Sequence, residues 1–153
     1  MIDRFVVVPA SYVLFMRQVG GEDQILLQLR QGTGYMDDHW ATAAAGHVEQ
    51  GESVFEAARR EATEELGVTD LELTPLCAMH RTGATGDPID ERVDYFPLAT
   101  SWSGDPRIVE ADKCADLRWF GVHDLPVPVV PHELQVIEAL RDGTLQPIVA
   151  HGF

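Results

Sequence analysis

Residues 46–68 (GHVEQGESVFEAARREATEELGV) constrain the chain more than any other segment, because their second half fits one amphipathic helix. Ser53 followed by Glu56 matches the capping-box pattern of a helix start, and Gly67 suits the left-handed position after a helix end. Apolar residues recur at helical spacing along one side: Val54, Ala57, Ala58, Ala62 and Leu66. The segment therefore predicts a helix that buries this side against the rest of the fold.

The opposite side of the predicted helix carries three acids. Glu61, Glu64 and Glu65 stand at positions i, i+3 and i+4, so their carboxylates can point the same way. Like charges at this spacing cost roughly 0.2–0.5 kcal/mol per pair, and Arg60 offsets some of that repulsion. Taken alone, such a pattern is most often a solvated acidic face. Clustered carboxylates also suit a hard divalent cation, Mg²⁺ or Mn²⁺, rather than zinc.

The residues that surround the acids favour the cation. They reproduce, with its spacing, every named position of the Nudix box: Gly46, Glu52, Arg60, Glu61, Ala62, Glu64, Glu65, Gly67 and Val68. The chain thus resembles the Nudix (MutT-type) hydrolases. It departs from many of them just before Gly46, where Ala43, Ala44 and Ala45 replace a Leu-Pro-Gly sequence. The missing proline affects the expected shape of that loop rather than the metal site.

The resemblance implies a fold and a set of site residues. The fold is α/β, a Nudix-type α/β/α sandwich with a mixed sheet and a central catalytic helix. The implied ligands of Mg²⁺ or Mn²⁺ are the Gly46 carbonyl, Glu61, Glu64 and Glu65. Of these, Glu61 and Glu65 are the expected direct ligands, while Glu64 ligates or assists water. Glu52 and Arg60 are expected to form a supporting pair that orients the ligand helix.

A second segment, VEADKCADLRWF, resembles the E-x-x-K-C and Trp-Phe pattern of small nucleotide-cleaving members such as the oxidised-purine triphosphate hydrolases. On that basis Glu110 is a candidate further ligand or general base, with Asp112 as the alternative. An ordinary exposed loop acid is the other interpretation of Glu110. Lys113 is a candidate phosphate contact, and it could equally pair with a neighbouring acid.

Four residues outside these motifs are candidate substrate contacts. Arg30 ends a predicted strand, where it can meet a phosphate or remain a surface charge. The polar, glycine-containing loop that follows holds Tyr35 and Trp40, either of which can stack on a base. Trp40 can instead pack the loop onto the core. Tyr95 and Phe96 point to opposite faces of a predicted strand, and Phe96 is taken as the side chain that faces the ligand.

Hydrophobic runs predict a sheet and a second helix within one domain, residues 1–153. The expected strands are 5–8, 11–17, 24–30, 71–81, 92–98 and 116–122. Gly20 and Gly21 predict a turn that makes a hairpin of the second and third strands. Residues 132–141 show helical spacing with Gly143 as the stop, which predicts a helix that covers the sheet.

Composition limits the partners. The formal charge is −14, from 25 acids against 11 basic residues, and such a surface repels polynucleotides. A small phosphorylated ligand remains compatible where metal ions neutralise it. Cys77 and Cys114 lack metal or disulfide spacing, which favours a reduced, cytoplasmic setting. The first residues lack a signal-peptide pattern, and no apolar run approaches the roughly 20 residues of a membrane span.

Together these observations predict a metal-dependent hydrolase that cuts a phosphoanhydride bond in a nucleoside diphosphate linked to a group X. The favoured substrate is a nucleoside triphosphate, standard or oxidised, which would give monophosphate and pyrophosphate. The alternatives are a nucleotide-sugar pyrophosphatase of the ADP-ribose type and a non-catalytic nucleotide-sensing module. The complete set of box acids argues against the sensing module. A homodimer, common in the family, is left open because no residue pattern establishes it.

Overall fold

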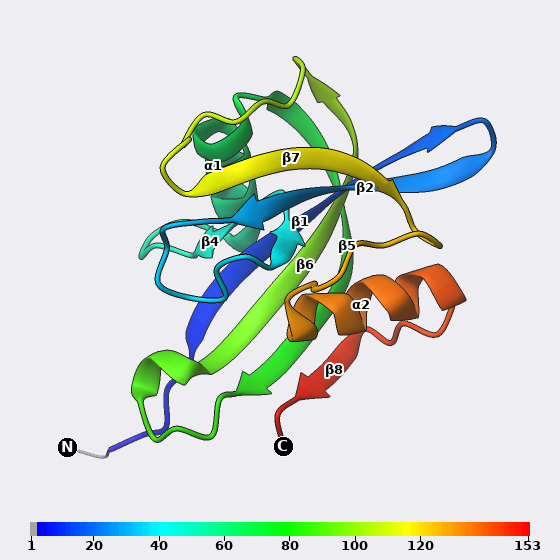
Figure 1. The fold of residues 1–153 in the computed structure, drawn as a ribbon. Helices are drawn as coiled ribbons and strands as arrows, with labels where there is room; N and C mark the ends of the chain where they lie inside the picture. Colours follow the sequence, from blue (N-terminus) through cyan, green and yellow to red (C-terminus); the bar gives the residue numbers. More distant parts are fainter. Residues whose placement is uncertain (1–2) are drawn as a thin grey trace.

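The computed structural model describes residues 3–153, which form one mixed β-sheet with a helix on each face (Figure 1). The hydrogen-bonded order is β3-β2-β1-β6-β5-β8, while β4 pairs with β1 and β7 pairs with β2. The strands are β1 (Val8–Val19), β2 (Glu22–Arg30), β3 (Trp40–Thr42), β4 (Ala44–His47), β5 (Thr69–Thr82), β6 (Glu91–Ser103), β7 (Cys114–Gly121) and β8 (Ile148–His151). No helix in this part of the chain has the length and hydrophobicity that a membrane span requires.

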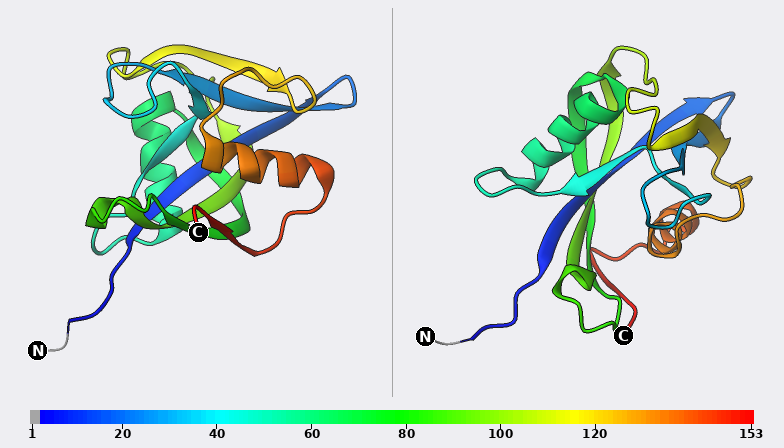
Figure 2. Two further views of the ribbon diagram at one scale, coloured as in Figure 1. Left: turned by 60° about the horizontal axis from the view of Figure 1, so that its bottom comes forward. Right: turned by 60° about the vertical axis from the view of Figure 1, so that its left-hand side comes forward.

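Strand β1 organises the sheet because it pairs with three other strands. It is antiparallel to β4 and β2 and parallel to β6. Val13 and Phe15 enter the core beneath α1 (Val54–Leu66), whereas Leu14 enters the core beneath α2 (Pro131–Asp142). The alternation of side chains along one strand thus divides the core in two. The two helices consequently lie on opposite sides of the sheet (Figure 2).

The predicted box helix is confirmed as α1. The Ser53 hydroxyl accepts a hydrogen bond from the backbone N–H of Glu56, and Gly67 adopts the left-handed conformation with φ of 68°. The buried side chains of the helix are small apart from Leu66 at its end; they are Ala57, Ala58, Ala62 and Leu66. Small side chains allow α1 to pack closely on the sheet, which brings its acidic side next to the short strand β4.

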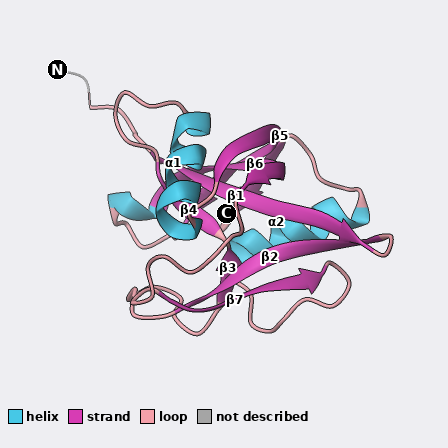
Figure 3. Cartoon of the chain, turned by 90° about the horizontal axis from the view of Figure 1, so that it is seen from above, coloured by secondary structure: helices cyan, strands magenta, loops and turns pink. Residues whose placement is uncertain are grey.

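The other expected elements are largely found, with revised bounds. The hairpin around Gly20 and Gly21 is confirmed, and α2 ends at Gly143 as predicted. Phe5 and Val6 were expected in a strand but precede β1 and are exposed. β3, β4 and β8 were missed because they are short and lack an alternating pattern. Strand β7 runs beside β2 on the side away from β1 (Figure 3).

Candidate active site

Two carboxylates of α1 lie directly on strand β4. The backbone N–H of Ala45 donates a hydrogen bond to Oε2 of Glu65 at 2.8 Å. At the next residue, Gly46, a Cβ atom would overlap the carboxylate of Glu61. Glycine at this position therefore leaves the Glu61 carboxylate room to lie directly against β4. The structure thus brings together three of the predicted metal-binding residues, Gly46, Glu61 and Glu65.

Arg60 forms ion pairs with Glu61 and with two neighbouring acids. Its guanidinium lies 2.6 Å from Oε1 of Glu52, 2.7 Å from Oε1 of Glu61 and 3.3 Å from Oε2 of Glu64. It also donates to the backbone carbonyl of His47 at 3.1 Å. Arg60 and Glu52 are therefore in the arrangement expected of a supporting pair. Glu64 is the most exposed of the three box acids, with 54% of its side chain accessible.

Burial sets the electrostatics of the site. It is the main cause that raises the pKa of Glu65 to about 8, and the neighbouring charges of Glu61 and Glu110 raise it further. Burial also raises the pKa of Glu61, against the opposing effect of Arg60. Negative charge placed in so dry an environment is unfavourable unless a proton or a cation compensates it. The site is consequently an environment that favours a bound cation.

The donor set fits a hard divalent cation. The candidate ligands are all oxygen atoms, as Mg²⁺ and Mn²⁺ prefer. Within residues 3–153, no protein group donates a hydrogen bond to Oε1 of Glu65, so that atom is free to ligate. No three His, Cys, Asp or Glu side chains of the described chain converge into a closed metal site. This agrees with the position of Arg60, which holds Glu61 and Glu64 in ion pairs.

The loop before β7 lies against the end of α1. The backbone N–H of Val109 donates to the carbonyl of Glu65 at 3.3 Å, and that of Arg107 donates to Leu66 at 3.0 Å. Glu110 is thereby held near the box acids, and the Nζ atom of Lys113 lies 3.2 Å from its carboxylate. The structure thus places the predicted loop acid beside the site and pairs Lys113 with it.

A pocket of about 400 Å³ opens beside β4. Two predicted contacts line it: Arg30 donates to the backbone carbonyl of Tyr35 at 2.8 Å and lies over the Tyr35 ring. The lining residues that sequence reasoning missed are Tyr12, His47, Arg81, Ile89, Asp90, Arg92 and Glu133. They come from separate strands, a loop and α2, so no local pattern groups them. The buried arginines at 81 and 92 carried the only available signal, as charges inside strands.

Three predicted substrate contacts do not line this pocket: Phe96, Trp40 and Lys113, which pairs with Glu110. Phe96 is 1% exposed and stacks on Tyr12 with ring centroids 5.2 Å apart, so its assignment as a ligand contact is wrong. Alternation along the strand puts Tyr95 and Phe96 on opposite faces, and Phe96 lies on the core face. Trp40 packs edge-to-face on Phe120 at 4.8 Å and contacts the core cluster beneath α2. It takes the packing role that was the alternative to base stacking.

Replacing Gly46 by alanine is expected to weaken binding of Mn²⁺ at least about tenfold, because the new methyl group displaces the Glu61 carboxylate. Electron paramagnetic resonance of free Mn²⁺ measures the change. Gly121→Ala is the matched control, since a Cβ atom there meets only ordinary contact at 3.9 Å. Equal Mn²⁺ affinity in the two variants would remove Gly46 and Glu61 from the cation site.

Glu133 makes stability depend on pH. It is 3% exposed, burial raises its pKa to about 7 from 4.5, and Thr42 N–H donates to it at 2.7 Å. The folded state then holds a proton that the unfolded state loses, so stability falls as pH rises from about 4.5 to about 7. Glu133→Gln is expected to gain in free energy of unfolding relative to the native protein across this window. Urea unfolding at both ends measures the gain, and a constant difference contradicts it.

Comparison with known proteins identifies the family of this chain. Residues 8–140 match the family model of the NUDIX domain. A MutT NUDIX hydrolase from Burkholderia pseudomallei is 32% identical with a TM-score of 0.70, and the match covers 85% of this chain and 96% of that chain. No curated protein sequence gave a significant match.

Two further solved structures share the fold. The NUDIX domain of Shewanella oneidensis NrtR, solved with ADP ribose, is 19% identical with a TM-score of 0.73, over 90% of this chain and 88% of that chain. An Ap4A hydrolase from C. elegans is 25% identical with a TM-score of 0.55, over 76% of this chain and 82% of that chain. The complete Nudix box on α1 and the family match agree. The chain therefore belongs to the Nudix family and is a pyrophosphohydrolase that acts on the anhydride bond of nucleoside diphosphates linked to a further group.

Proposed function

We propose that this hydrolase uses Mg²⁺ or Mn²⁺ to cut a nucleoside triphosphate, standard or oxidised, into monophosphate and pyrophosphate. One juxtaposition carries the proposal. The carboxylates of Glu61 and Glu65, which belong to α1, lie against β4. Residues of β4 also line a pocket together with Arg30 and Tyr35. The proposed metal-binding carboxylates thus lie next to the Arg30 guanidinium, which suits a phosphate, and the Tyr35 ring, which suits a base.

Each residue has a distinct role in this proposal. A bound divalent cation would neutralise the phosphate oxygens and lower the pKa of a coordinated water. Glu61, Glu65 and the Gly46 carbonyl would hold it, while Arg60 and Glu52 keep Glu61 oriented. The oxygen of water attacks a phosphorus atom of the anhydride, and the bond between that phosphorus and the bridging oxygen breaks. The bridging oxygen keeps the electron pair and leaves as part of the other product, monophosphate or pyrophosphate.

The proton and the substrate need further groups. Glu110 is our candidate to accept the proton of the attacking water, with Glu64 as the alternative, since both carboxylates lie beside the buried pair. Arg30 would orient a phosphate, and Tyr35, which is 47% exposed, would stack on the base. Lys113 would hold Glu110 or contact phosphate as the ion pair opens.

An ADP-ribose-type pyrophosphatase is the second candidate. The observation that favours it is the similar fold of the NrtR domain, which was solved with ADP ribose. The pocket beside β4 is large enough for a sugar as well as for a base. The cytoplasmic setting and a homodimer stay predictions.

A substrate panel separates the candidates. Nucleoside triphosphates, oxidised purine triphosphates, ADP-ribose and a dinucleoside tetraphosphate are each incubated with the protein and Mg²⁺, and released phosphate and pyrophosphate are measured separately. Pyrophosphate release from a triphosphate is the expected dominant reaction. Faster cleavage of ADP-ribose, without pyrophosphate, would replace the first candidate by the second. Absence of turnover on every compound with either metal would contradict both.

A further inference from the structure

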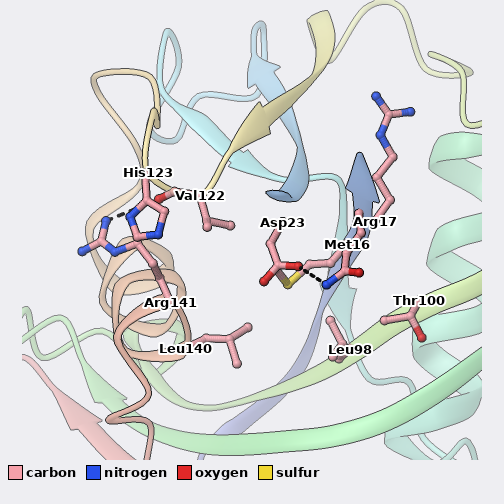
Figure 4. A pocket seen from close by; sticks show the side chains of 10 residues that line it. Met16, Arg17, Asp23, Leu98, Thr100, Val122, His123, Leu140 and Arg141 are labelled. Carbon is pink, nitrogen blue, oxygen red and sulfur yellow. Dashed lines mark hydrogen bonds between the residues drawn. The ribbon is translucent and has the colours of Figure 1, made fainter. Parts of the chain in front are cut away.

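A large cavity outside the site offers no convergent chemistry. It is one of two such cavities of similar size, about 460 Å³ for this one and about 470 Å³ for the other, and it lies between the far end of β1 and the carboxyl end of α2 (Figure 4). Its apolar side chains include Leu98 and Leu140, while the charged groups at its edge are already paired. Arg141 binds Asp142 at 2.8 Å, and Arg17 lies over the ring of Trp119. The charges that remain unexplained belong to the pocket beside β4.

Two arginines face each other across strands β5 and β6. Arg81 and Arg92 are direct cross-strand partners, an arrangement that is destabilising for like charges. Asp94, which is fully buried, lies between them: Nε of Arg81 is 2.6 Å from Oδ2, and Nε of Arg92 is 3.5 Å from Oδ1. The Tyr12 hydroxyl accepts from both guanidiniums at 3.3 and 3.5 Å. One carboxylate therefore fixes two guanidiniums in the wall of the pocket.

This cluster carries excess positive charge. Two guanidiniums against the single carboxylate of Asp94 leave one net positive charge. Arg30, in the same wall, adds a second, because its hydrogen bonds within the described chain go only to the Thr33 hydroxyl and the Tyr35 carbonyl. The acids at the pocket do not cancel it fully. Asp90 offsets one of these charges, and Glu133, whose pKa burial raises to about 7, offsets only part of another.

The hydrogen bonding of the cluster is incomplete as well. Within residues 3–153, the buried Nε of Arg92 and Oδ1 of Asp94 have no hydrogen-bond partner. Arg92 still forms an ion pair with Asp94 at 3.5 Å, but buried polar atoms that lack a hydrogen bond reduce stability. A ligand that accepts hydrogen bonds from guanidinium groups would recover that loss of stability.

Strand β1 lies between β4, which contacts the acids of α1, and β6, which carries Arg92 and Asp94. His47 of β4 and Asp94 of β6 pair with the same residue, Ala10, from opposite edges of β1. Neighbouring strands are about 4.8 Å apart, so the backbone at Asp94 lies roughly 10 Å from β4. The acids of α1 contact β4, whereas Arg81 and Arg92 extend from β5 and β6 on the other side of β1. We therefore assign the acids and the arginines to different parts of the substrate.

We propose that Arg81 and Arg92, positioned by Asp94 and joined by Arg30, bind a phosphate monoester that is separate from the anhydride being cut. The inference rests on the proposed hydrolase function and adds a preference to it: of two substrates that differ by one phosphate on the nucleoside or on the group X, the phosphorylated one is favoured. Guanidinium groups match phosphate oxygens two at a time. A phosphate monoester near pH 7 carries about −1.5 to −2 charges, which suits a pocket wall that holds three guanidinium groups.

Metal-free binding of inorganic phosphate tests the arginines without turnover. Phosphate is titrated against sodium chloride of equal ionic strength, and the rise in Tm reports binding. Native protein and the control Arg17→Gln are expected to respond equally. Arg92→Gln and Arg81→Gln should bind at least about tenfold more weakly. Arg92→Lys keeps the positive charge but loses the paired N–H donors of the guanidinium, so an intermediate phosphate affinity is expected. Partial binding by this variant would show that the loss in Arg92→Gln is not caused by misfolding. Unchanged phosphate affinity in both glutamine variants overturns the proposal.

Matched substrate pairs test the specificity. Each pair differs by one phosphate: NADH and NADPH, dephospho-coenzyme A and coenzyme A, and ADP-ribose and the derivative of ADP-ribose that carries a phosphate on its distal ribose. At least one phosphorylated member should be preferred about tenfold in kcat/KM, and Arg92→Gln should lose that preference while Arg17→Gln keeps it. Cleavage without preference in any pair overturns the inference and leaves the hydrolase proposal intact. If the protein cleaves neither a triphosphate nor any compound of these pairs, the hydrolase proposal is overturned. The binding of inorganic phosphate then still decides whether the arginines form a phosphate site.

Discussion

Replacing Glu65 by glutamine is expected to lower kcat with Mg²⁺ at least about 100-fold, because the loss of about 2.7–4 kcal/mol of charge stabilisation has that effect. The amide can still accept the hydrogen bond of Ala45, so the helix should keep its place on β4. What it loses is the negative charge beside Glu61 and the Gly46 carbonyl. Steady-state kinetics on the best triphosphate, at saturating Mg²⁺, measure the effect.

Two further variants make this result specific. Glu64→Gln is expected to lower turnover to a similar degree, although its carboxylate is more exposed. Glu56→Gln changes an exposed acid in the first turn of the same helix, away from β4, and should retain near-native turnover. Near-native activity in Glu65→Gln would remove Glu65 from the reacting site. Urea unfolding of each variant confirms that the comparison is between folded proteins.

Replacing Asp94 by alanine is expected to destabilise the fold by about 3–5 kcal/mol, because it leaves two buried guanidiniums without their shared carboxylate. Both partners are held between strands, with Arg81 at 2.6 Å and Arg92 at 3.5 Å. His132, which also lies 3.7 Å from Asp94, cannot compensate because an imidazole supplies no negative charge. The midpoint and slope of urea unfolding give the free-energy change.

An exposed ion pair provides the matched control. Asp142 lies 2.8 Å from Arg141 at the end of α2, with half of its side chain accessible. Asp142→Ala should therefore cost no more than about 1 kcal/mol, since solvent screens such pairs. If Asp94→Ala unfolds at the same urea concentration as Asp142→Ala, the carboxylate does not hold the arginines together.

The sequence predicted the local parts of the site well. The Ser53 cap, the end of α1 at Gly67 and the shared side of Glu61 and Glu65 all follow from spacings of a few residues. Those spacings fix hydrogen bonds and helix faces without help from the rest of the chain. The pairing of Arg60 with Glu52 required only the helix and the turn before it.

The walls of the pocket were beyond sequence reasoning. Arg81 and Arg92 lie opposite each other because β5 and β6 pair in one register among several that an isolated sequence allows. Phe96 was assigned to the wrong face for the same reason. β4 has no strand pattern of its own, and forms because β1 offers it backbone partners.

The sequence by itself determined the Nudix box, the helix that carries it and the oxygen chemistry of its acids, because each depends on neighbours within a turn or two. Only the tertiary structure decided that β4 lies under Glu61 and Glu65, and that three arginines share the adjoining pocket. Those positions depend on strand register and on close packing between distant segments. Long-range strand pairing thus determines which groups line the substrate pocket, and local spacing determines the acids proposed to bind the metal ion.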